Sequence, residues 1–361
     1  MSVQRTIRVE LGDRGYPIWI GRNLLADTSL WRPMLSGRHA LLVSNDVVAP
    51  LYAESVCAGL DGLASAQVVL PDGEANKNLG SIQKIFSALG RLGATRDACL
   101  IALGGGVVGD MTGFAAACWM RGIDFVQMPT SLLAMVDASV GGKTGVNLEF
   151  GKNLVGAFHQ PRAVLIDTDV LATLPDREYR TGLAEVVKHG AIGDSDFIAR
   201  LEQQVDALNR RDHDALAELI EHACRFKAAI VARDETEQGQ RALLNFGHTF
   251  AHALETETGY GQLLHGEAVA IGMCQAARLS ARLGFADADA GARLARLLVA
   301  LGLPTRPPAA LDASALVSHM RLDKKNRGAH LRLILWRGLG QAFIADDVPA
   351  HVIHEVLAES S

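Results

Sequence analysis

Short apolar runs alternate with amphipathic stretches throughout the first half of the chain, and this alternation limits the fold more than any other feature. Five runs have the length and composition of strands: Ala40–Ser44, Ala66–Leu70, Ala98–Leu103, Phe125–Pro129 and Ala163–Asp167. Stretches with helical periodicity, such as Leu79–Leu92 and Gly109–Met120, lie between them. Strands that alternate with helices build a mostly parallel sheet covered on both faces. We therefore predict a Rossmann-like α/β domain.

The character of the sequence changes after Leu174-Pro175. From Arg180 to about Leu303 the chain is rich in Ala, Leu, Glu and Arg, with helical periodicity and no strand signal. A chain of 361 residues also exceeds the usual size of one hydrophobic core. We predict two domains, an α/β domain over residues 1–175 and a mainly α-helical domain over residues 176–361. The second domain is expected to end with a hairpin of Leu331–Trp336 and Gln341–Ile344.

Composition excludes several classes of protein. The 35 basic and 40 acidic residues give a net charge of -5, which argues against a sequence-independent nucleic-acid binder. The five cysteines are widely spaced, which favours buried thiols over disulfides or a thiolate zinc site. There is no basic-then-apolar signal pattern at the start, and the apolar runs are too short to span a bilayer. We expect a cytoplasmic protein that binds neither nucleic acid nor membrane.

A glycine-rich turn follows one of the predicted strands. Gly104, Gly106 and Gly109 match the G-x-G-x-x-G pattern, which is weak on its own in a chain with 36 glycines. Its position is informative, because it follows an apolar run and opens a helix, where backbone amides and the helix dipole favour a phosphate. The acid that usually binds ribose is missing after the next strand, which ends Met128-Pro129-Thr130. We favour an unusual pyrophosphate-binding turn over a tight turn that merely needs glycine.

A basic, glycine-rich segment follows. Lys143, Lys152 and Asn153 lie in a loop-like region of low apolar content. Two lysines on a flexible backbone suit a phosphate or carboxylate, and a solvated surface loop is the alternative interpretation. Asp137 stands inside an apolar run, so it requires a partner, either in a structural ion pair or in a ligand contact.

The second half contains one carboxylate and several imidazoles that together suit a metal ion. Helical periodicity places Glu185 and Lys188 on one face among Val and Leu residues. An intrahelical ion pair is the simpler interpretation of these two residues alone. A metal ligand is the alternative, if other donors converge on the same carboxylate.

The candidate donors are histidines about sixty to eighty residues further on. We predict Asn245, His248 and His252 on one helical stripe, and histidines at i and i+4 are a known metal geometry. The segment 265–267 offers either His265 or Glu267. Spacing leaves open which of His252, His265 and Glu267 completes the site. Three protein ligands would leave an open position for a substrate oxygen, and we expect the chemistry where the two halves meet.

Together these segments resemble the 3-dehydroquinate synthase family. The resemblance runs from Pro17–Gly21 to Asp323–Lys325, nearly the whole chain. It rests on Asp72-Gly73-Glu74 with Lys77, Gly104–Asp110, Met120–Gly122, Leu132–Asp137, Gly141–Lys143, Gly151–Leu154, Gly182–Lys188, and Arg241–His248 with His252. Such a set is far more specific than any single motif.

The resemblance implies a full set of site residues. The family's metal ligands match Glu185, His248 and His265, and the metal is usually zinc or cobalt. The family's NAD contacts match Asp72, Gly73, Glu74, Lys77, Gly105, Gly106, Val107, Val108, Gly109, Asp110, Thr130, Ser131, Lys143, Lys152 and Thr173. Its substrate and catalytic residues match Arg121, Asp137, Lys152, Asn153, Lys188, Lys227, Glu237, Arg241, Asn245, His252 and Lys324, with Arg121 at the phosphate. The match at Ser44–Asp46 is ambiguous and receives no role, and the choice between Lys324 and Lys325 stays open.

The resemblance also implies a reaction. Its substrate is 3-deoxy-D-arabino-heptulosonate 7-phosphate, and its products are 3-dehydroquinate and phosphate. The C5 alcohol is oxidised with NAD, phosphate leaves from C7, the C5 ketone is reduced again, and the ring closes as an aldol. The first domain would then bind NAD and the second the metal and substrate, in a homodimer.

Three alternatives have to be separated from this interpretation. A related sugar phosphate cyclase would make an inosose or a valiolone. A metal-dependent polyol dehydrogenase would consume NAD stoichiometrically, and a regulator would bind NAD without catalysis. Arg241, Asn245 and the Lys152-Asn153 pair fit a substrate with a carboxylate, which favours dehydroquinate.

Overall fold

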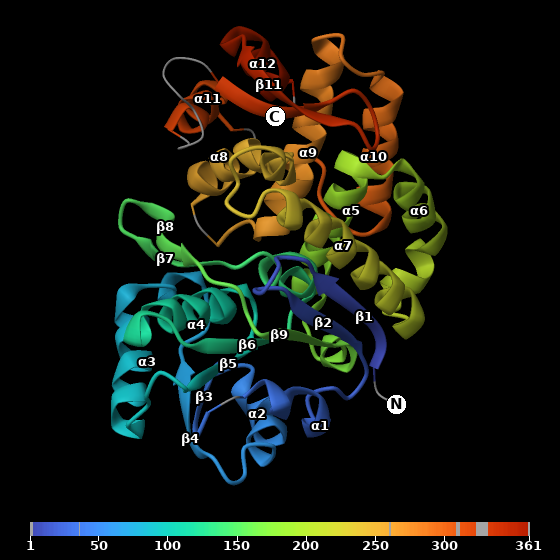
Figure 1. Cartoon of the computed structure of the whole chain (residues 1–361). Coiled ribbons are helices and arrows are strands. Elements are labelled where there is room, and N and C mark those ends of the chain that lie inside the picture. Colours follow the sequence, from blue (N-terminus) through green and yellow to red (C-terminus); the bar gives the residue numbers. More distant parts are fainter. Residues whose placement is uncertain (1–2, 36, 260, 308–310, 323–330, 360–361) are drawn as a thin grey trace. The chain divides into compact units, whose positions relative to one another are not determined.

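The computed structural model describes residues 3–35, 37–259, 261–307, 311–322 and 331–359 (Figure 1). The chain forms two compact units. Unit 1 consists of Met1–Leu174 and Leu216–Thr236, and unit 2 of Pro175–Ala215 and Glu237–Ser361. Most of helix α7 (His213–Arg233) therefore belongs to unit 1, although it follows the first helices of unit 2 in the sequence.

Unit 1 is built on a seven-stranded sheet in the order β1-β2-β9-β6-β5-β3-β4. Its strands are β1 (Val3–Val9), β2 (Tyr16–Gly21), β3 (His39–Asn45), β4 (Ala64–Leu70), β5 (Cys99–Gly104), β6 (Asp124–Pro129) and β9 (Ala163–Asp167). Only the β1–β2 pairing in this sheet is antiparallel. The five strands predicted from the sequence are confirmed, and so is the α/β fold class of this part of the chain.

Helices α2 (Ala49–Ala58), α3 (Leu79–Leu92) and α4 (Gly106–Cys118) of unit 1 pack against strands of this sheet. The unit also contains α1 (Thr28–Trp31) and α7, with short turns at Arg32–Met34, Glu74–Asn76, Trp119–Arg121, Ala134–Ala138 and Thr168–Ala172. Helix α3 begins where the Asn78 side chain accepts a hydrogen bond from the Ser81 amide, and it ends at Gly93, whose φ of 67° is left-handed. Its buried face carries Ile82, Ile85 and Leu89, which join strand side chains in one core.

The order of the strands creates a switch point. After β3 the chain runs outward through α2 to the edge strand β4, and then returns through α3 to β5 on the other side of β3. Connections from β3 and β5 therefore leave toward opposite sides. In open parallel sheets a ligand binds where the carboxyl ends of two such strands diverge.

The predicted glycine-rich loop is instead a β-hairpin, so that prediction was wrong. Strands β7 (Lys143–Leu148) and β8 (Gly151–Phe158) pair in antiparallel fashion, with Gly145 opposite Gly156. A Cβ atom on either glycine would collide with a backbone oxygen of the facing strand. These glycines serve close pairing of two strands, and not the flexibility that their number suggested.

Unit 2 is mainly helical, as predicted. It contains α5 (Asp176–Gly193), α6 (Ser195–Asn209), η6 (Gln240–Asn245), α8 (His248–Thr258), α9 (His265–Arg282), α10 (Ala288–Ala300), α11 (Ala313–Leu322), α12 (Ala350–Ala358) and the strands β10 (Leu331–Trp336) and β11 (Ala342–Val348). The last two strands pair as the predicted hairpin. Helix α9 packs against α5, α8, α10, α12 and β10 and is buried along most of its length.

Glycines bring the neighbours of α9 very close. A Cβ atom at Gly266 would collide with the Thr181 carbonyl oxygen on α5, and one at Gly272 with the Gly247 carbonyl oxygen just before α8. The starts of α8 and α9 are thereby fixed against α5 and against each other. This arrangement positions the residues described below.

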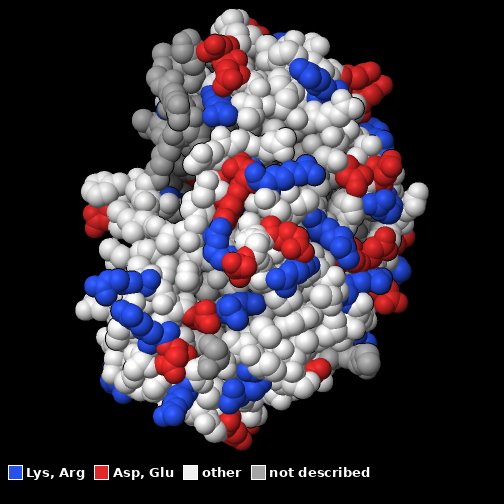
Figure 2. Space-filling view, viewed as in Figure 1, with Lys and Arg blue, Asp and Glu red and all other residues white. Residues whose placement is uncertain are grey.

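The surface carries charges of both signs. On the face shown in Figure 2, Lys and Arg side chains are interspersed with Asp and Glu side chains. Within the part of the chain that the structure describes, no helix combines the length and the apolar character that crossing a membrane requires.

Candidate active site

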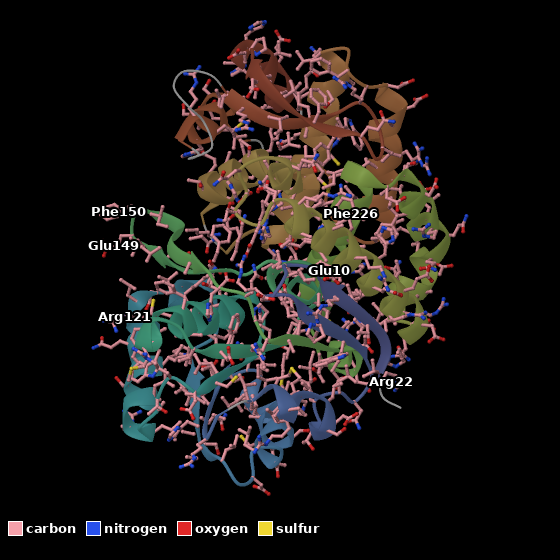
Figure 3. The ribbon with its side chains drawn as sticks, viewed as in Figure 1. Glu10, Arg22, Arg121, Glu149, Phe150 and Phe226 are labelled. Atoms are coloured by element: carbon pink, nitrogen blue, oxygen red, sulfur yellow. The ribbon has the colours of Figure 1, made fainter. Side chains whose placement is uncertain are left out.

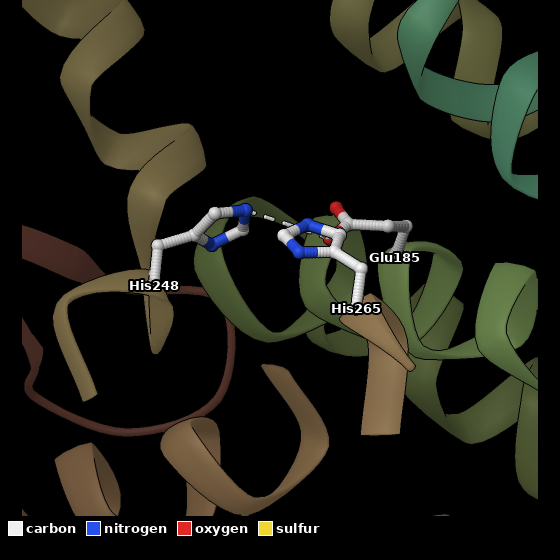
Figure 4. A group of neighbouring side chains, drawn as sticks. All are labelled: Glu185, His248 and His265. Atoms are coloured by element: carbon white, nitrogen blue, oxygen red, sulfur yellow. Dashed lines mark ion pairs between the residues drawn. The ribbon is translucent and has the colours of Figure 1, made fainter. Parts of the chain in front are cut away.

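Three helices of unit 2 present metal-ligand atoms to one point. Glu185 comes from the middle of α5, and His248 and His265 are the first residues of α8 and α9 (Figure 4). The Nε2 atoms of His248 and His265 lie 3.6 and 3.7 Å from Glu185 Oε1. Ligand atoms about 2.1 Å from a tetrahedral zinc ion lie roughly 3.4 Å from one another. Both distances to Glu185 Oε1 are therefore close to the spacing of ligands around one ion, and all three donor atoms lie within 4.8 Å of one another.

The burial of this carboxylate also calls for a cation. Glu185 is fully buried, and Lys188 Nζ contacts its Oε2 atom, so the predicted intrahelical ion pair is present. Glu185 Oε1 has no hydrogen-bond donor among the described residues. A buried carboxylate oxygen without a donor is costly, and a divalent cation held with the two imidazoles would satisfy it. The residues present thus fit a metal.

The outer nitrogens of both imidazoles have acceptors close by. His248 Nδ1 lies 3.3 Å from the Phe246 carbonyl oxygen, and His265 Nδ1 lies 3.4 Å from Glu255 Oε1. Burial lowers the pKa of His265, but Glu255 and Glu185 raise it, and the net shift is upward. An acceptor at Nδ1 favours the tautomer whose Nε2 lone pair is available to a metal.

The other two candidates for the third ligand have different surroundings. His252 is half-buried one turn after His248, with the two rings edge to face at 5.8 Å. Both Glu267 carboxylate oxygens accept bonds of 2.7 Å from Arg177, and one accepts from the Leu264 amide at the start of α9. Burial raises the pKa of Glu267, but these donors together lower it by more than burial raises it, so the net shift of the pKa is downward. Glu267 therefore caps a helix, and His265 is the residue that joins the cluster.

Asn245 is not on the helical stripe of the two histidines, so this prediction was wrong. It ends the 3-10 turn η6, and Gly247, with a φ of 81°, separates it from α8. A Cβ atom at Gly247 would lie 2.7 Å from the Met273 amide nitrogen on α9, which explains the break. Asn245 Nδ2 donates to Glu237 Oε1 at 2.8 Å, and the neighbouring Arg241 is buried.

In unit 1, the residues expected to bind NAD, apart from Lys143 and Lys152 on the hairpin, follow the carboxyl ends of parallel strands. The segment 72–77 follows β4, Gly105–Asp110 follows β5, Thr130-Ser131 follows β6, and Thr173 lies beyond β9. Parallel strands place these ends at one edge of the sheet, and the switch point between β3 and β5 lies on the same edge.

The glycines of the turn allow α4 to begin close to the sheet. A Cβ atom on Gly104 would lie 2.7 Å from the Val108 side chain, and one on Gly109 would lie 2.8 Å from Gln127 Oε1 on β6. Gly105 is the N-cap of α4, and Gly106, Val107 and Val108 form its first turn. The first amides of a helix have no partner within it, so this turn offers donors and a positive dipole to an anion.

A buried lysine joins this turn to the β7–β8 hairpin. Lys77 Nζ lies 2.5 Å from Asp110 Oδ2 and 2.6 Å from Asn153 Oδ1. Burial lowers the pKa of Lys77, but Asp110 and Glu74 raise it, and the net shift is upward, so the ammonium stays charged. Asn147 completes the connection, because it donates to Glu74 Oε1 and accepts from the Asn153 amide, each at 2.8 Å. In the sequence, Asn147 is only a polar residue between Val146 and Leu148, so no pattern pointed to this role.

Strand β6, the next strand in the chain, ends at Pro129 without an acid, as the sequence indicated. The switch point lies between β5 and β3. Strand β3 ends in Asn45, and Asp46 follows. Asn45 Nδ2 donates to Asp72 Oδ1 at 2.5 Å, and the Asp72 amide donates to Asp46 Oδ1 at 2.9 Å.

Two further sets of predicted residues lie in unit 1. Lys227 Nζ on α7 lies 2.6 Å from Asp137 Oδ1, which supplies the partner that this buried run required. The Thr173 hydroxyl lies 2.5 Å from the Tyr52 hydroxyl, the Thr130 amide donates to the Gly104 carbonyl oxygen, and the Ser131 hydroxyl accepts from the Ala134 amide.

The remaining cations are spread along the unit. Lys143 begins β7 and is exposed, and Lys152 is half-buried on β8. Arg121 is exposed at the periphery of unit 1 (Figure 3), just beyond the end of α4 that lies opposite the glycine turn. A 13-residue helix is about 20 Å long, so Arg121 is remote from that turn within this unit. Lys324 lies outside the described residues.

The chain is similar in sequence to known proteins over nearly its whole length. The chain matches the family description "3-dehydroquinate synthase N-terminal" over residues 67–181 and "3-dehydroquinate synthase C-terminal" over residues 182–326. It is 56% identical to the 3-dehydroquinate synthase of Methylococcus capsulatus, over 98% of both chains.

Solved structures of related cyclases have the same fold. One is ValA, a 2-epi-5-epi-valiolone synthase from Streptomyces hygroscopicus with NAD+ and Zn2+ bound, at 30% identity and a TM-score of 0.87 over 96% of this chain and 97% of that one. Another is a 2-deoxy-scyllo-inosose synthase complexed with carbaglucose-6-phosphate, NAD+ and Co2+, at 27% identity and a TM-score of 0.89 over 99% and 100% of the chains. With sequence matches that span nearly its whole length, the chain belongs to the 3-dehydroquinate synthase family.

Proposed function

We propose that this protein is a carbon–oxygen lyase that converts 3-deoxy-D-arabino-heptulosonate 7-phosphate into 3-dehydroquinate and phosphate, a step of the shikimate pathway to aromatic amino acids. It would use NAD and one zinc or cobalt ion. The observation that carries the proposal is the cluster of buried Glu185 and His248 with half-buried His265, in a chain with full-length 3-dehydroquinate synthase relatives at 52–56% identity. The NAD- and metal-bound cyclases of the same fold support the cofactors.

The bound cofactors would supply hydride transfer at C5 and Lewis-acid polarisation of the substrate oxygens. Oxidation at C5 makes the C6 proton acidic, so that phosphate can leave from C7. Reduction of the C5 ketone, opening of the ring and aldol closure then give the product. NAD is regenerated in each turnover.

In the proposal, unit 2 holds the metal and much of the substrate. Glu185, His248 and His265 would bind the ion and leave a position open to a substrate oxygen. Arg241 and Asn245 would bind and orient the carboxylate end of the substrate, and His252 would move protons. Lys188, which contacts the metal-binding carboxylate of Glu185, would place a positive charge near the substrate anion.

Unit 1 would hold NAD along the carboxyl edge of its sheet. The amides of the first turn of α4 suit the pyrophosphate, and residues 72–77 suit the adenosine half. Lys152 and Asn153 on the hairpin would clamp the phosphate of the substrate and hold one conformer against side reactions. Arg121 lies too far from them within this chain to join the same clamp. Asp137 and Lys227 would assist as a charged pair that can share a proton with the substrate.

A related cyclase activity is the second candidate, because the two cyclase structures share this fold over nearly the whole chain. One assay separates the candidates. The purified protein receives the seven-carbon phosphate with a catalytic amount of NAD, and phosphate and dehydroquinate are measured. We expect both products in equal amounts without net NADH. Cyclisation of glucose 6-phosphate or sedoheptulose 7-phosphate instead would identify another cyclase, and NADH accumulation would identify a dehydrogenase.

We also propose that the protein acts as a cytoplasmic homodimer. The support is the family resemblance together with the soluble-type composition. Light scattering coupled to size-exclusion chromatography tests the dimer, with a mass of twice 38.5 kDa as the expected result.

A further inference from the structure

The two imidazoles of the metal cluster differ in what holds their outer nitrogen. At His248 the acceptor is the Phe246 carbonyl oxygen, part of the backbone that leads into α8. At His265 the acceptor is a side chain, the carboxylate of Glu255. A backbone carbonyl is present whatever residue stands at that position, whereas the acceptor at His265 exists only because residue 255 is a glutamate.

Glu255 is placed for this contact by its helix. It lies seven residues after His248 on α8, two turns along the same face, because 3.6 residues make one turn. Its side chain is buried, with 5% of the residue exposed, in the packed interface between α8 and α9. Burying a carboxylate is unfavourable unless a donor or a cation compensates its charge. The imidazole of His265 is such a partner for Glu255.

The geometry of the ring separates the two carboxylates that flank it. Glu255 Oε1 lies 3.4 Å from His265 Nδ1, and Glu185 Oε1 lies 3.7 Å from His265 Nε2. The two nitrogens of an imidazole point in divergent directions. Glu255 therefore acts from the side of the ring that faces away from the metal donors, and it is outside the group of donor atoms that lie within 4.8 Å of one another.

We propose that Glu255 is the positioning residue of the metal ligand His265. Its carboxylate accepts the Nδ1 hydrogen, which sets the ring orientation and leaves the Nε2 lone pair directed at the ion. A carboxylate behind a ligating histidine also makes the imidazole a stronger donor. This inference rests on the proposed metal site and adds to it a residue that the sequence did not single out.

Metal affinity tests the role without reference to turnover. Glu255→Leu removes the acceptor at similar volume, and Glu255→Gln keeps an acceptor without the charge. Zinc affinity is measured by competition with a chelator, and the Co2+ visible spectrum reports ligand number and geometry. We expect Glu255→Leu to weaken zinc binding by roughly 10- to 100-fold, the usual effect of an outer-shell partner, and Glu255→Gln to restore most of the loss.

Glu257→Leu is the matched control. Glu257 lies on the same helix and contacts His319 at 2.9 Å, so its loss removes a carboxylate and an ion pair from α8 without touching the cluster. We expect parental zinc affinity and a parental Co2+ spectrum for this variant. Equal losses in the Glu255 and Glu257 variants would show a general effect on α8 and overturn the proposal.

The other possible results also test the positioning role of Glu255. If Glu255→Leu does not fold, Glu255→Asp takes its place, because the shorter side chain withdraws the carboxylate from Nδ1. Parental zinc affinity in the folded Leu variant, or in the Asp variant when Leu is unfolded, would overturn the positioning role. Failure of the parent protein itself to bind zinc or cobalt would instead contradict the metal site of the proposed function.

Discussion

At the scale of single residues, spacing named the candidate metal donors but could not choose among them, and only the resemblance to the family singled out His265. Helical spacing identified His248 and His252 because they lie on one strand-free, periodic segment. The choice between His265 and Glu267 depends on the direction in which α9 begins, and that direction is set by Gly266 packing on Thr181. Such a contact between distant segments leaves no local pattern. The roles of Glu255 and Asn147 could not be predicted for the same reason, because each contacts a segment that is distant in the sequence.

Replacement of a ligand should separate the metal from NAD. We expect His265→Ala to lose zinc affinity by more than the roughly 100-fold upper range of outer-shell partners, and to lose turnover in parallel. NAD binding should persist, because the residues proposed to bind it belong to unit 1. Metal content by elemental analysis and NAD affinity by calorimetry check this. Full turnover with retained metal would refute the ligand assignment.

Acid should weaken metal binding earlier than an ordinary histidine would predict. The neighbouring carboxylates raise the pKa of His265 above its usual 6.5 despite burial, and a protonated imidazole cannot bind a metal. Metal binding must then displace a proton at and below that raised pKa. We expect zinc affinity to be constant at higher pH and to fall as the pH decreases through this pKa. A pH series of chelator competitions measures it, and constant affinity from about pH 8 to pH 6 would contradict the expectation.

At the scale of elements, continuous apolar runs predicted strands well where strands are buried on both sides. All six residues of β5 are buried, and its run was visible in the sequence. The β7–β8 hairpin was missed because β8 has no buried residue, β7 is buried only over residues 144–146, and the glycines resemble those of a loop. Only the paired register shows that Gly145 and Gly156 must lack side chains to let the strands approach.

A small substitution in this hairpin should therefore be severe. We expect Gly156→Ala to destabilise the protein by about 1–3 kcal/mol, since its Cβ atom would overlap the Thr144 carbonyl oxygen. It should also raise KM, because Lys152 and Asn153 lie on the same strand. Gly90→Ala on α3 is the control, as its nearest neighbour is 4.0 Å away and alanine favours helices. Denaturant unfolding and steady-state kinetics compare them, and equal stabilities would show that the hairpin tolerates a side chain here.

At the scale of the whole molecule, the sequence predicted an α/β part followed by a helical part, and the structure has both. The periodic pattern of α7 predicted a helix correctly, but periodicity gives no information about the core against which a helix packs. Residues 216–236 pack with unit 1, where Lys227 meets Asp137. That pairing joins residues 90 positions apart and could not be read from either segment alone.

Removal of the metal tests how independent the two units are. We expect a chelator to abolish turnover, and added Zn2+ or Co2+ to restore it, while NAD still raises the melting temperature of the metal-free protein. Calorimetric melting with and without NAD, before and after chelation, measures this. Loss of the NAD effect on chelation would mean that the metal cluster also maintains the nucleotide-binding edge.

The bridge made by Lys77 has a consequence for how the two small molecules influence one another. One ammonium group donates both to Asp110 beside the glycine turn and to Asn153 on the hairpin, so the position of a single side chain determines both contacts. A ligand that binds to Asp110 or to Asn153 changes the hydrogen bond of that residue with Lys77, and thereby the free energy of the contact between Lys77 and the other residue. Thermodynamic reciprocity then requires the dinucleotide to alter the affinity for the sugar acid by the same factor as the sugar acid alters the affinity for the dinucleotide.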